Sequence, residues 1–306
     1  MKKIFILISF LWATVANTQE EAVFNQYMLT PSLVNPGATG FDEAMKVSLH
    51  FKNQWTGFPG APRSLAVNLN GPIGEKLGLG VILNSDNAAA GTRLKGQLNY
   101  GFRFKINEFK MGIGLSTQIQ RVSLSDKILS DSKYQSGDPL AERAINGENF
   151  FDASAGLYGS YNDRFMFGFS ALNLIQQRLG AVAGPQNKDK GLNYYTFMLG
   201  YKYKTELYSL TPSLMLRNVK DSPFTVDMNL IGNFLNDRLM VGASYRAGTG
   251  GVVGFMGGTK INNFQLAYSF DFGFAGLQKF GGGTHEMTVA YTFGKGFFAK
   301  DEKYKN

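Results

Sequence analysis

An alternation of apolar and polar residues, which recurs in about fourteen segments of roughly ten residues, constrains the fold more than any other feature. In the segment 45–53, for example, apolar Leu49 and Phe51 alternate with polar His50 and Lys52. Because successive side chains of a strand point to opposite faces, each segment has one apolar and one polar face. The connections are alternately very short and long, a combination that predicts an all-β, transmembrane antiparallel β-barrel rather than a soluble sandwich.

The expected strands are bounded by turn residues, mostly Asn, Asp and Gly. They cover residues 45–53, 63–70, 76–85, 92–105, 109–120, 150–161, 163–172, 192–204, 207–217, 223–233, 237–246, 251–260, 262–272 and 284–294. An even strand number puts both ends of the chain on one side, and short turns are typically periplasmic, so we expect periplasmic termini and extracellular longer loops. Pro212 lies inside the ninth expected strand and cannot donate a ladder hydrogen bond, which predicts a bulge or broken pairing there.

The residues outside the strands suggest a division into four parts. Residues 1–18 have the basic start and short apolar run of a secretory signal peptide; cleavage after Ala16 or after Thr18 fits, and the second is favoured. Residues 19–44 either hang in the periplasm or plug the lumen of the barrel at 45–294. Residues 295–306 form a basic periplasmic tail. The chain has no Cys, which excludes acylation on cysteine and disulfides.

Charged residues gather on the polar parity of the strands. A charge on the lipid face costs about 2 to 4 kcal/mol near the bilayer midplane, so these side chains are expected to face the lumen. The main members of this set are Lys46, Lys52, Arg93, Lys95, Arg103, Lys202, Arg217, Asp227, Arg246, Asp271 and Glu286. The formal net charge of +8 does not indicate nucleic-acid binding, because the lysines are spread over many strands of a secreted chain.

The sequence contains no strong catalytic, metal-binding or phosphate-binding motif. The two histidines, His50 and His285, lie on the first and last expected strands but on opposite parities, which argues against one metal or catalytic site. The glycines of 78–80 do not open a phosphate-binding helix, and Asp131 and Asp138 lack calcium-loop spacing. We therefore expect no catalytic residue, no cofactor and no metal, and an enzyme is the least favoured class.

The loop 54–62 is expected to form a constrained extracellular cap. Trp55, Phe58 and Pro59 are bulky residues between glycines and prolines, a composition that favours fixed turns. Such a loop either folds over the pore or binds a partner, although a membrane-interface position for Trp55 explains it equally well. Phe24 and Tyr27 in the preceding segment are further candidates for partner binding or for a plug.

Several blocks of the chain resemble one known family. They are Phe24-Asn25-Gln26-Tyr27-Met28, Val34-Asn35-Pro36-Gly37-Ala38-Thr39-Gly40 and Asn53-Gln54-Trp55-Thr56-Gly57-Phe58-Pro59-Gly60-Ala61-Pro62, and the similarity continues at 221–224, 227–229, 241–246 and 284–287, with Tyr291 and Phe293. These blocks are similar to the PorP/SprF family of type IX secretion system outer-membrane proteins. The resemblance implies an integral outer-membrane component that works with periplasmic ring proteins and with exported substrates carrying a C-terminal sorting domain, and in some members in gliding motility. The alternative left open is a passive porin or a transporter of small or hydrophobic solutes.

Overall fold

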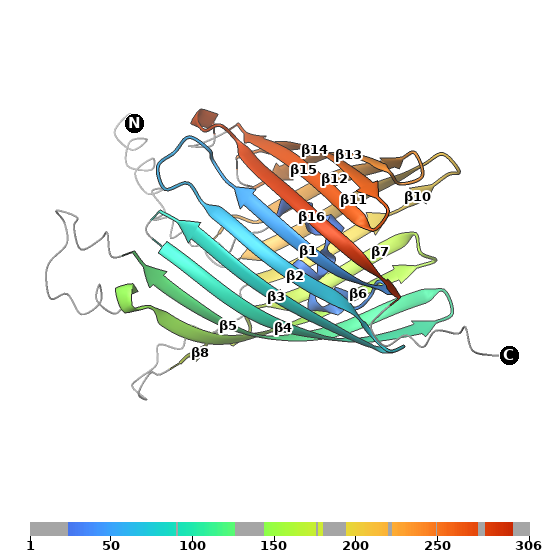
Figure 1. Cartoon of the computed structure of the whole chain (residues 1–306), viewed down its shortest axis with the longest axis horizontal. Coiled ribbons are helices and arrows are strands. Elements are labelled where there is room, and N and C mark those ends of the chain that lie inside the picture. The colour runs from blue at the N-terminus through green and yellow to red at the C-terminus, as the bar shows by residue number, and fades with distance from the viewer. Residues whose placement is uncertain are drawn as a thin grey trace, which may run out of the picture.

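Fourteen long antiparallel strands form a closed barrel in this computed structural model (Figure 1). The structure describes residues 24–89, 91–125, 144–175, 177–179, 194–219, 222–248, 250–274 and 279–295. The expected signal peptide at 1–18, Asp131, Asp138 and the tail from 296 onwards lie outside the described residues.

The wall follows the chain order, each strand pairing with the next. Its members are β1 (Ala44–Asn53), β2 (Arg63–Ile73), β3 (Leu77–Ala88), β4 (Gly91–Ile106), β5 (Phe109–Leu124), β6 (Glu148–Tyr161), β7 (Phe165–Leu172), β9 (Tyr194–Tyr201), β11 (Tyr208–Val219), β12 (Thr225–Phe234), β13 (Leu239–Ala247), β14 (Val252–Ile261), β15 (Phe264–Gly273) and β16 (Thr284–Lys295). Two two-residue strands, β8 (Gln177–Arg178) and β10 (Tyr203–Lys204), pair with β6 and β11. The barrel closes because β16 pairs along the whole of β1.

The predicted strands are confirmed to within a few residues, and so is the expected disturbance at Pro212. Pairing to β11 stops after Gly200↔Ser213 and resumes at Tyr203↔Leu210, in the same register. The missing pairs lie opposite Pro212, which still pairs with β12 through Leu230. The outcome is therefore a break in the ladder without a bulge.

The outer and inner faces differ as strand parity predicts. Leu83, Leu115 and Phe255 on the outer face are 56%, 61% and 57% exposed, whereas Asn99 and Thr288 on the inner face are fully buried. An apolar outside and a polar, filled inside suit a barrel in lipid. No helix in the described ranges has the length and hydropathy to cross a membrane.

Residues 24–40, which precede β1, lie inside the barrel, where they appear in blue in Figure 1. This part, Phe24–Gly40, is called the inner segment below. It consists of three short 3-10 helices, η1 (Asn25–Leu29), η2 (Pro31–Leu33) and η3 (Pro36–Ala38). The barrel has two ends, a short-turn end where β1 begins and a long-loop end where β1 ends, and the inner segment runs from near the long-loop end to the short-turn end.

Candidate functional site

The first anchor of the inner segment is a carboxylate of the barrel wall. Glu286 near the long-loop end of β16 accepts hydrogen bonds from the backbone amides of Asn25 and Gln26, both at 2.8 Å. These amides open η1 and have no partner within the helix. The side-chain amide of Gln26 adds donations to Ser269 Oγ (2.9 Å) and to the Glu286 carbonyl (3.1 Å). One carboxylate thus fixes the start of η1, since charged acceptors form the stronger hydrogen bonds.

The Asn25 side chain joins charged residues of several strands. Its Oδ1 accepts from Lys52 Nζ (3.1 Å) and Arg246 Nη2 (2.8 Å), and its Nδ2 donates to Asp271. Arg246 also pairs with Asp227. Buried charges require partners of this kind, because an uncompensated charge out of water is costly. This set of residues, with Glu286, is called the charged anchor.

Tyr27 packs deeper in the lumen. It is 1% exposed and forms a cluster with Val34 and with Tyr194, Met198 and Met215 of the wall. Its hydroxyl accepts a hydrogen bond from Asn229 Nδ2 at 2.8 Å.

The second anchor is a row of glycines on the inner wall. Gly78, Gly101, Gly114 and Gly156 pair directly with one another across β3, β4, β5 and β6. The backbone of residues 35–40 lies against this glycine row. A β-carbon at Gly114 would lie 2.0 Å from the Pro36 carbonyl oxygen, and one at Gly101 or Gly78 would lie 2.3 Å from that of Thr39. No other residue type fits in this space, so glycine is required by the close approach of two backbones.

Hydrogen bonds hold the chain on the glycine row. Asn35 Nδ2 donates to the Leu157 and Phe169 carbonyls (2.9 and 3.3 Å), and Asn35 Oδ1 accepts from the Gly37 amide (2.8 Å). The row continues in β7 with Ser170, whose hydroxyl donates to the Val34 carbonyl at 2.9 Å. The Asn-Pro-Gly sequence is therefore the part of the inner segment shaped to this wall.

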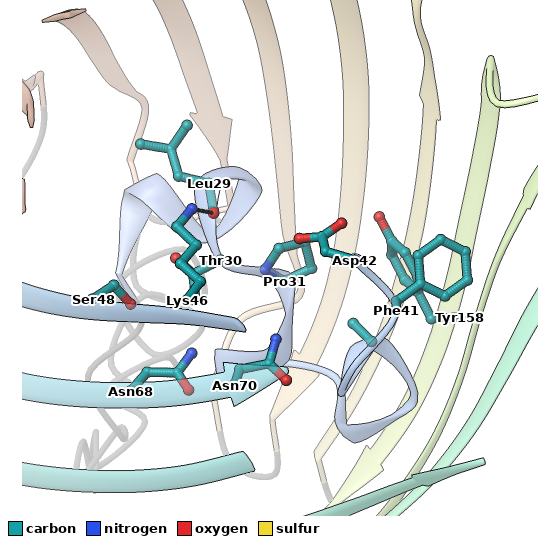
Figure 2. Close-up of a pocket in the computed structure, with 11 residues that line it drawn as sticks. Leu29, Thr30, Pro31, Phe41, Asp42, Lys46, Ser48, Asn68, Asn70 and Tyr158 are labelled. Atoms are coloured by element: carbon teal, nitrogen blue, oxygen red, sulfur yellow. Dashed lines mark hydrogen bonds between the residues drawn. The ribbon is translucent and has the colours of Figure 1, made fainter. Parts of the chain in front are cut away.

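Two basic residues fix the inner segment toward the short-turn end. Lys46 Nζ donates to the Leu29 carbonyl at 2.8 Å, as Figure 2 shows. Arg103 donates to the Gly40 carbonyl (2.7 Å) and to the Gly74 carbonyl in the β2–β3 turn (2.9 Å).

Three small cavities lie between the inner segment and the wall. The cavity of Figure 2, lined by Pro31, Lys46 and Tyr158 among others, has a volume of about 30 Å³, and two further cavities measure about 40 and 30 Å³. Volumes of this size hold one or two water molecules. The inner segment thus lies across the lumen at this level, with these small cavities beside it.

A larger cavity of about 780 Å³ lies between the charged anchor and the long-loop end. Its floor includes Asn25, Lys52 and Arg246, and its walls include Trp55 and Phe58 of the loop 54–62. We call this cavity the vestibule. It combines an apolar wall with a polar floor, as ligand sites commonly do.

The loop 54–62 is tied to its neighbours by backbone hydrogen bonds. Thr56 N donates to the Gly283 carbonyl (2.9 Å), and Gly282 N donates to that of Thr56 (2.6 Å). The Phe58 ring lies over Gly281, where a β-carbon would be 2.9 Å from the ring. These contacts lie beyond the β1–β16 seam that closes the barrel.

The two histidines lie in different surroundings. His50 is buried in the lumen between the hydroxyls of Ser48 (2.9 Å) and Thr288 (2.8 Å). His285 Nδ1 lies 2.6 Å from the hydroxyl of exposed Tyr268, close to the Phe270 ring. Within the described ranges, no group of three or more His, Asp or Glu side chains has the arrangement of a metal site.

The structure places the predicted site residues in three groups. Phe24 and Tyr27 are buried against the inner wall, whereas Trp55, Phe58 and Pro59 line the vestibule. Among the predicted lumen charges, the inner segment bonds directly to Lys46, Lys52, Arg103, Arg246, Asp271 and Glu286. Of the other predicted lumen charges, Asp227 bonds to Arg246 and Arg217 bonds to Thr225. Arg93 lines the vestibule, Lys95 lines a small cavity, and Lys202 follows the end of β9 at the ladder break.

Sequence reasoning missed the glycine row. Its signal is present, because glycines recur on the lumen parity of four consecutive strands, but only the pairing register shows that they are neighbours.

Comparisons with known proteins agree with this architecture. A family model described as type IX secretion system membrane protein PorP/SprF matches residues 16–291. No curated protein matches the chain significantly. Similar solved structures include a deltaS2 mutant of the TodX monoaromatic hydrocarbon channel (10% identity, 90% of this chain and 94% of that chain, TM-score 0.52), the CymD monoaromatic hydrocarbon channel (13%, 89% and 94%, 0.49) and Omp33 of Acinetobacter baumannii (11%, 83% and 99%, 0.43). The first of these likenesses shows the fold of an outer-membrane barrel.

Proposed function

The chain belongs to the PorP/SprF family of type IX secretion system membrane proteins, and from this membership we propose that it is a non-enzymatic, partner-binding barrel rather than an open pore. The observation that carries the proposal is the inner segment, which is buried and hydrogen-bonded inside the lumen and, in this proposal, obstructs it. A passive channel needs a continuous water path, whereas a docking component needs only a rigid barrel with shaped ends.

The obstruction is built into the wall. The glycine row leaves room for the backbone of residues 35–40, and the charged anchor satisfies the first amides of η1. A segment that merely passed through a pore would require neither device. The inner segment therefore serves as part of the folded barrel, and partners bind at the two ends.

We assign the long-loop end to the cell exterior and the short-turn end, with both termini, to the periplasm. In this orientation the vestibule with Trp55, Phe58 and Pro59 receives exported substrates that carry a C-terminal sorting domain. The short turns and the basic tail, which lies outside the described residues, face the periplasmic ring proteins. The link to gliding motility stays a prediction from the family resemblance.

A second candidate function is the transport of small or hydrophobic solutes. The observation that favours it is the vestibule of about 780 Å³ with its partly apolar wall, together with a fold shared with a channel for monoaromatic hydrocarbons. It requires that the inner segment move to open a path.

Deletion of the gene separates the two functions. We expect the deletion strain to lose export of particular sorting-domain cargo, measured by mass spectrometry of the medium and the cell surface, with unchanged permeability to small dyes and nutrients. Affinity capture of the tagged protein from membranes should then recover other secretion-system proteins. Normal export of all such cargo combined with loss of uptake of one solute would establish the transporter instead.

A further inference from the structure

The outer face of the barrel carries a groove toward its long-loop end. Gly96 on β4 lies between Leu83 of β3 and Ile119 of β5, which are its direct cross-strand partners. Both neighbours are large and more than half exposed. The missing side chain at Gly96 leaves a gap in the apolar surface, and the resulting groove has a volume of about 500 Å³.

A second small residue on the outer face extends this gap toward the long-loop end. Ser85, which is small, is flanked by its pairing partners Leu65 and Leu94. Val67 completes the apolar side. The groove therefore runs along the lipid-facing surface across β2 to β5, with the shape and polarity of a site for a hydrocarbon chain.

A charge stands where the groove meets the long-loop end. Arg121 on β5 has the same outward parity as Ile119 and pairs with Leu94, so its side chain borders the groove. Its Nη2 donates to the Asn146 carbonyl at 2.7 Å, which holds the guanidinium in place and leaves further N–H donors. A guanidinium at the edge of an apolar band lies at the level of lipid headgroups, and it binds phosphate in a bidentate manner.

We propose that this groove binds one molecule of the phosphorylated, multiply acylated glycolipid of the outer leaflet, with an acyl chain over Gly96 and a phosphate on Arg121. The charge complementarity of Arg121 and the position at the long-loop end select this lipid over a neutral or zwitterionic one. The assignment relies on the proposed orientation of the barrel but not on its role in secretion.

Two variants and two controls test the site. Gly96→Leu fills the groove without strain, because a β-carbon there meets only Leu83 Cδ2, at an ordinary 3.8 Å. Gly257→Leu is the matched control: Gly257 also pairs with outward residues, Val241 and Tyr268, and a β-carbon there meets nothing within 4 Å. Arg121→Gln removes the charge, and Arg238→Gln removes an exposed charge at the short-turn end.

The measurement is native mass spectrometry of the full mature chain in mild detergent, titrated with bisphosphorylated lipid A, monophosphoryl lipid A or phosphatidylethanolamine. The wild type should retain one lipid A, and Gly96→Leu should weaken its binding about tenfold, since displacing two or more methylenes has that effect. Arg121→Gln should weaken binding as well and should reduce the difference between the two lipid A forms. Equal binding by phosphatidylethanolamine, or equal losses in both leucine variants, would show ordinary surface lipid and overturn the proposal. These outcomes leave the secretion role untouched.

Discussion

At the scale of single residues, the position of the inner segment depends both on glycines that lack a side chain and on polar side chains that bind it. Gly114 has no β-carbon because the Pro36 carbonyl occupies that place. Asn25, by contrast, meets two cations and a carboxylate with one amide group. Substitution in the glycine row therefore causes overpacking, whereas substitution in the charged anchor removes hydrogen-bond and charge partners.

Substitution Gly114→Val should displace the inner segment while the strands still pair, because overpacking costs about 1 to 3 kcal/mol, less than the pairing of a whole barrel supplies. We expect a steady conductance in planar bilayers that the wild type lacks. Gly257→Val on the outer face is the control and should remain non-conducting. Non-conducting Gly114→Val barrels with native thermal stability would contradict the close approach at the glycine row.

Substitution Arg246→Ser should leave Asp227 without its pairing cation, a loss of about 3 to 5 kcal/mol for a buried pair, yet the barrel should still fold. Phe169→Arg places a charge on the lipid face, where Phe169 is 46% exposed, at a cost of about 2 to 4 kcal/mol, and should impair assembly. Heat-modifiable migration on gels reports folding. Survival of that migration in Phe169→Arg and its loss in Arg246→Ser would reverse the assignment of the two faces.

At the scale of elements, the strands could be predicted from the sequence and the position of the inner segment could not. Alternation with period two identifies each strand and its lipid face, and a proline inside β11 predicts the ladder break. The path of residues 24–40 depends instead on contacts with distant strands, such as the bond between Asn35 and the Leu157 carbonyl. Its own sequence has no period, which is why a plug and a periplasmic extension were equally consistent with it.

Deletion of residues 24–40 tests the inner segment as an element. We expect the shortened barrel to insert into lipid bilayers and to conduct steadily, since the charges that line the lumen then attract water. A full-length chain measured in the same membranes is the reference and should stay closed. If the deletion variant inserts but remains closed, other parts of the chain obstruct the lumen.

At the scale of the whole molecule, the two ends of the barrel differ in construction. The short-turn end has brief connections and two basic residues that hold the inner segment. The long-loop end has the vestibule and the tied loop 54–62. This asymmetry gives the molecule a direction in the membrane that labelling can determine.

A cysteine introduced at Thr56 should react with a membrane-impermeant maleimide in intact cells, because the loop 54–62 belongs to the long-loop end, which we assign to the exterior. The chain has no native Cys, so only the introduced cysteine of this protein can react. A cysteine at Glu108, in the β4–β5 turn, should react only after the outer membrane is opened. Labelling in the opposite order would invert the proposed orientation.

The charged anchor joins residues from opposite ends of the chain, since Asn25 and Glu286 are 261 positions apart. The glycine row, in contrast, belongs to β3 to β6, the early part of the wall. A ribbon of the first strands can therefore receive residues 35–40 before the wall is complete, whereas η1 gains its carboxylate only when β16 arrives beside β1. Closure of the barrel and anchoring of the inner segment at the long-loop end therefore occur in one step. A chain that lacks the β15–β16 hairpin loses both.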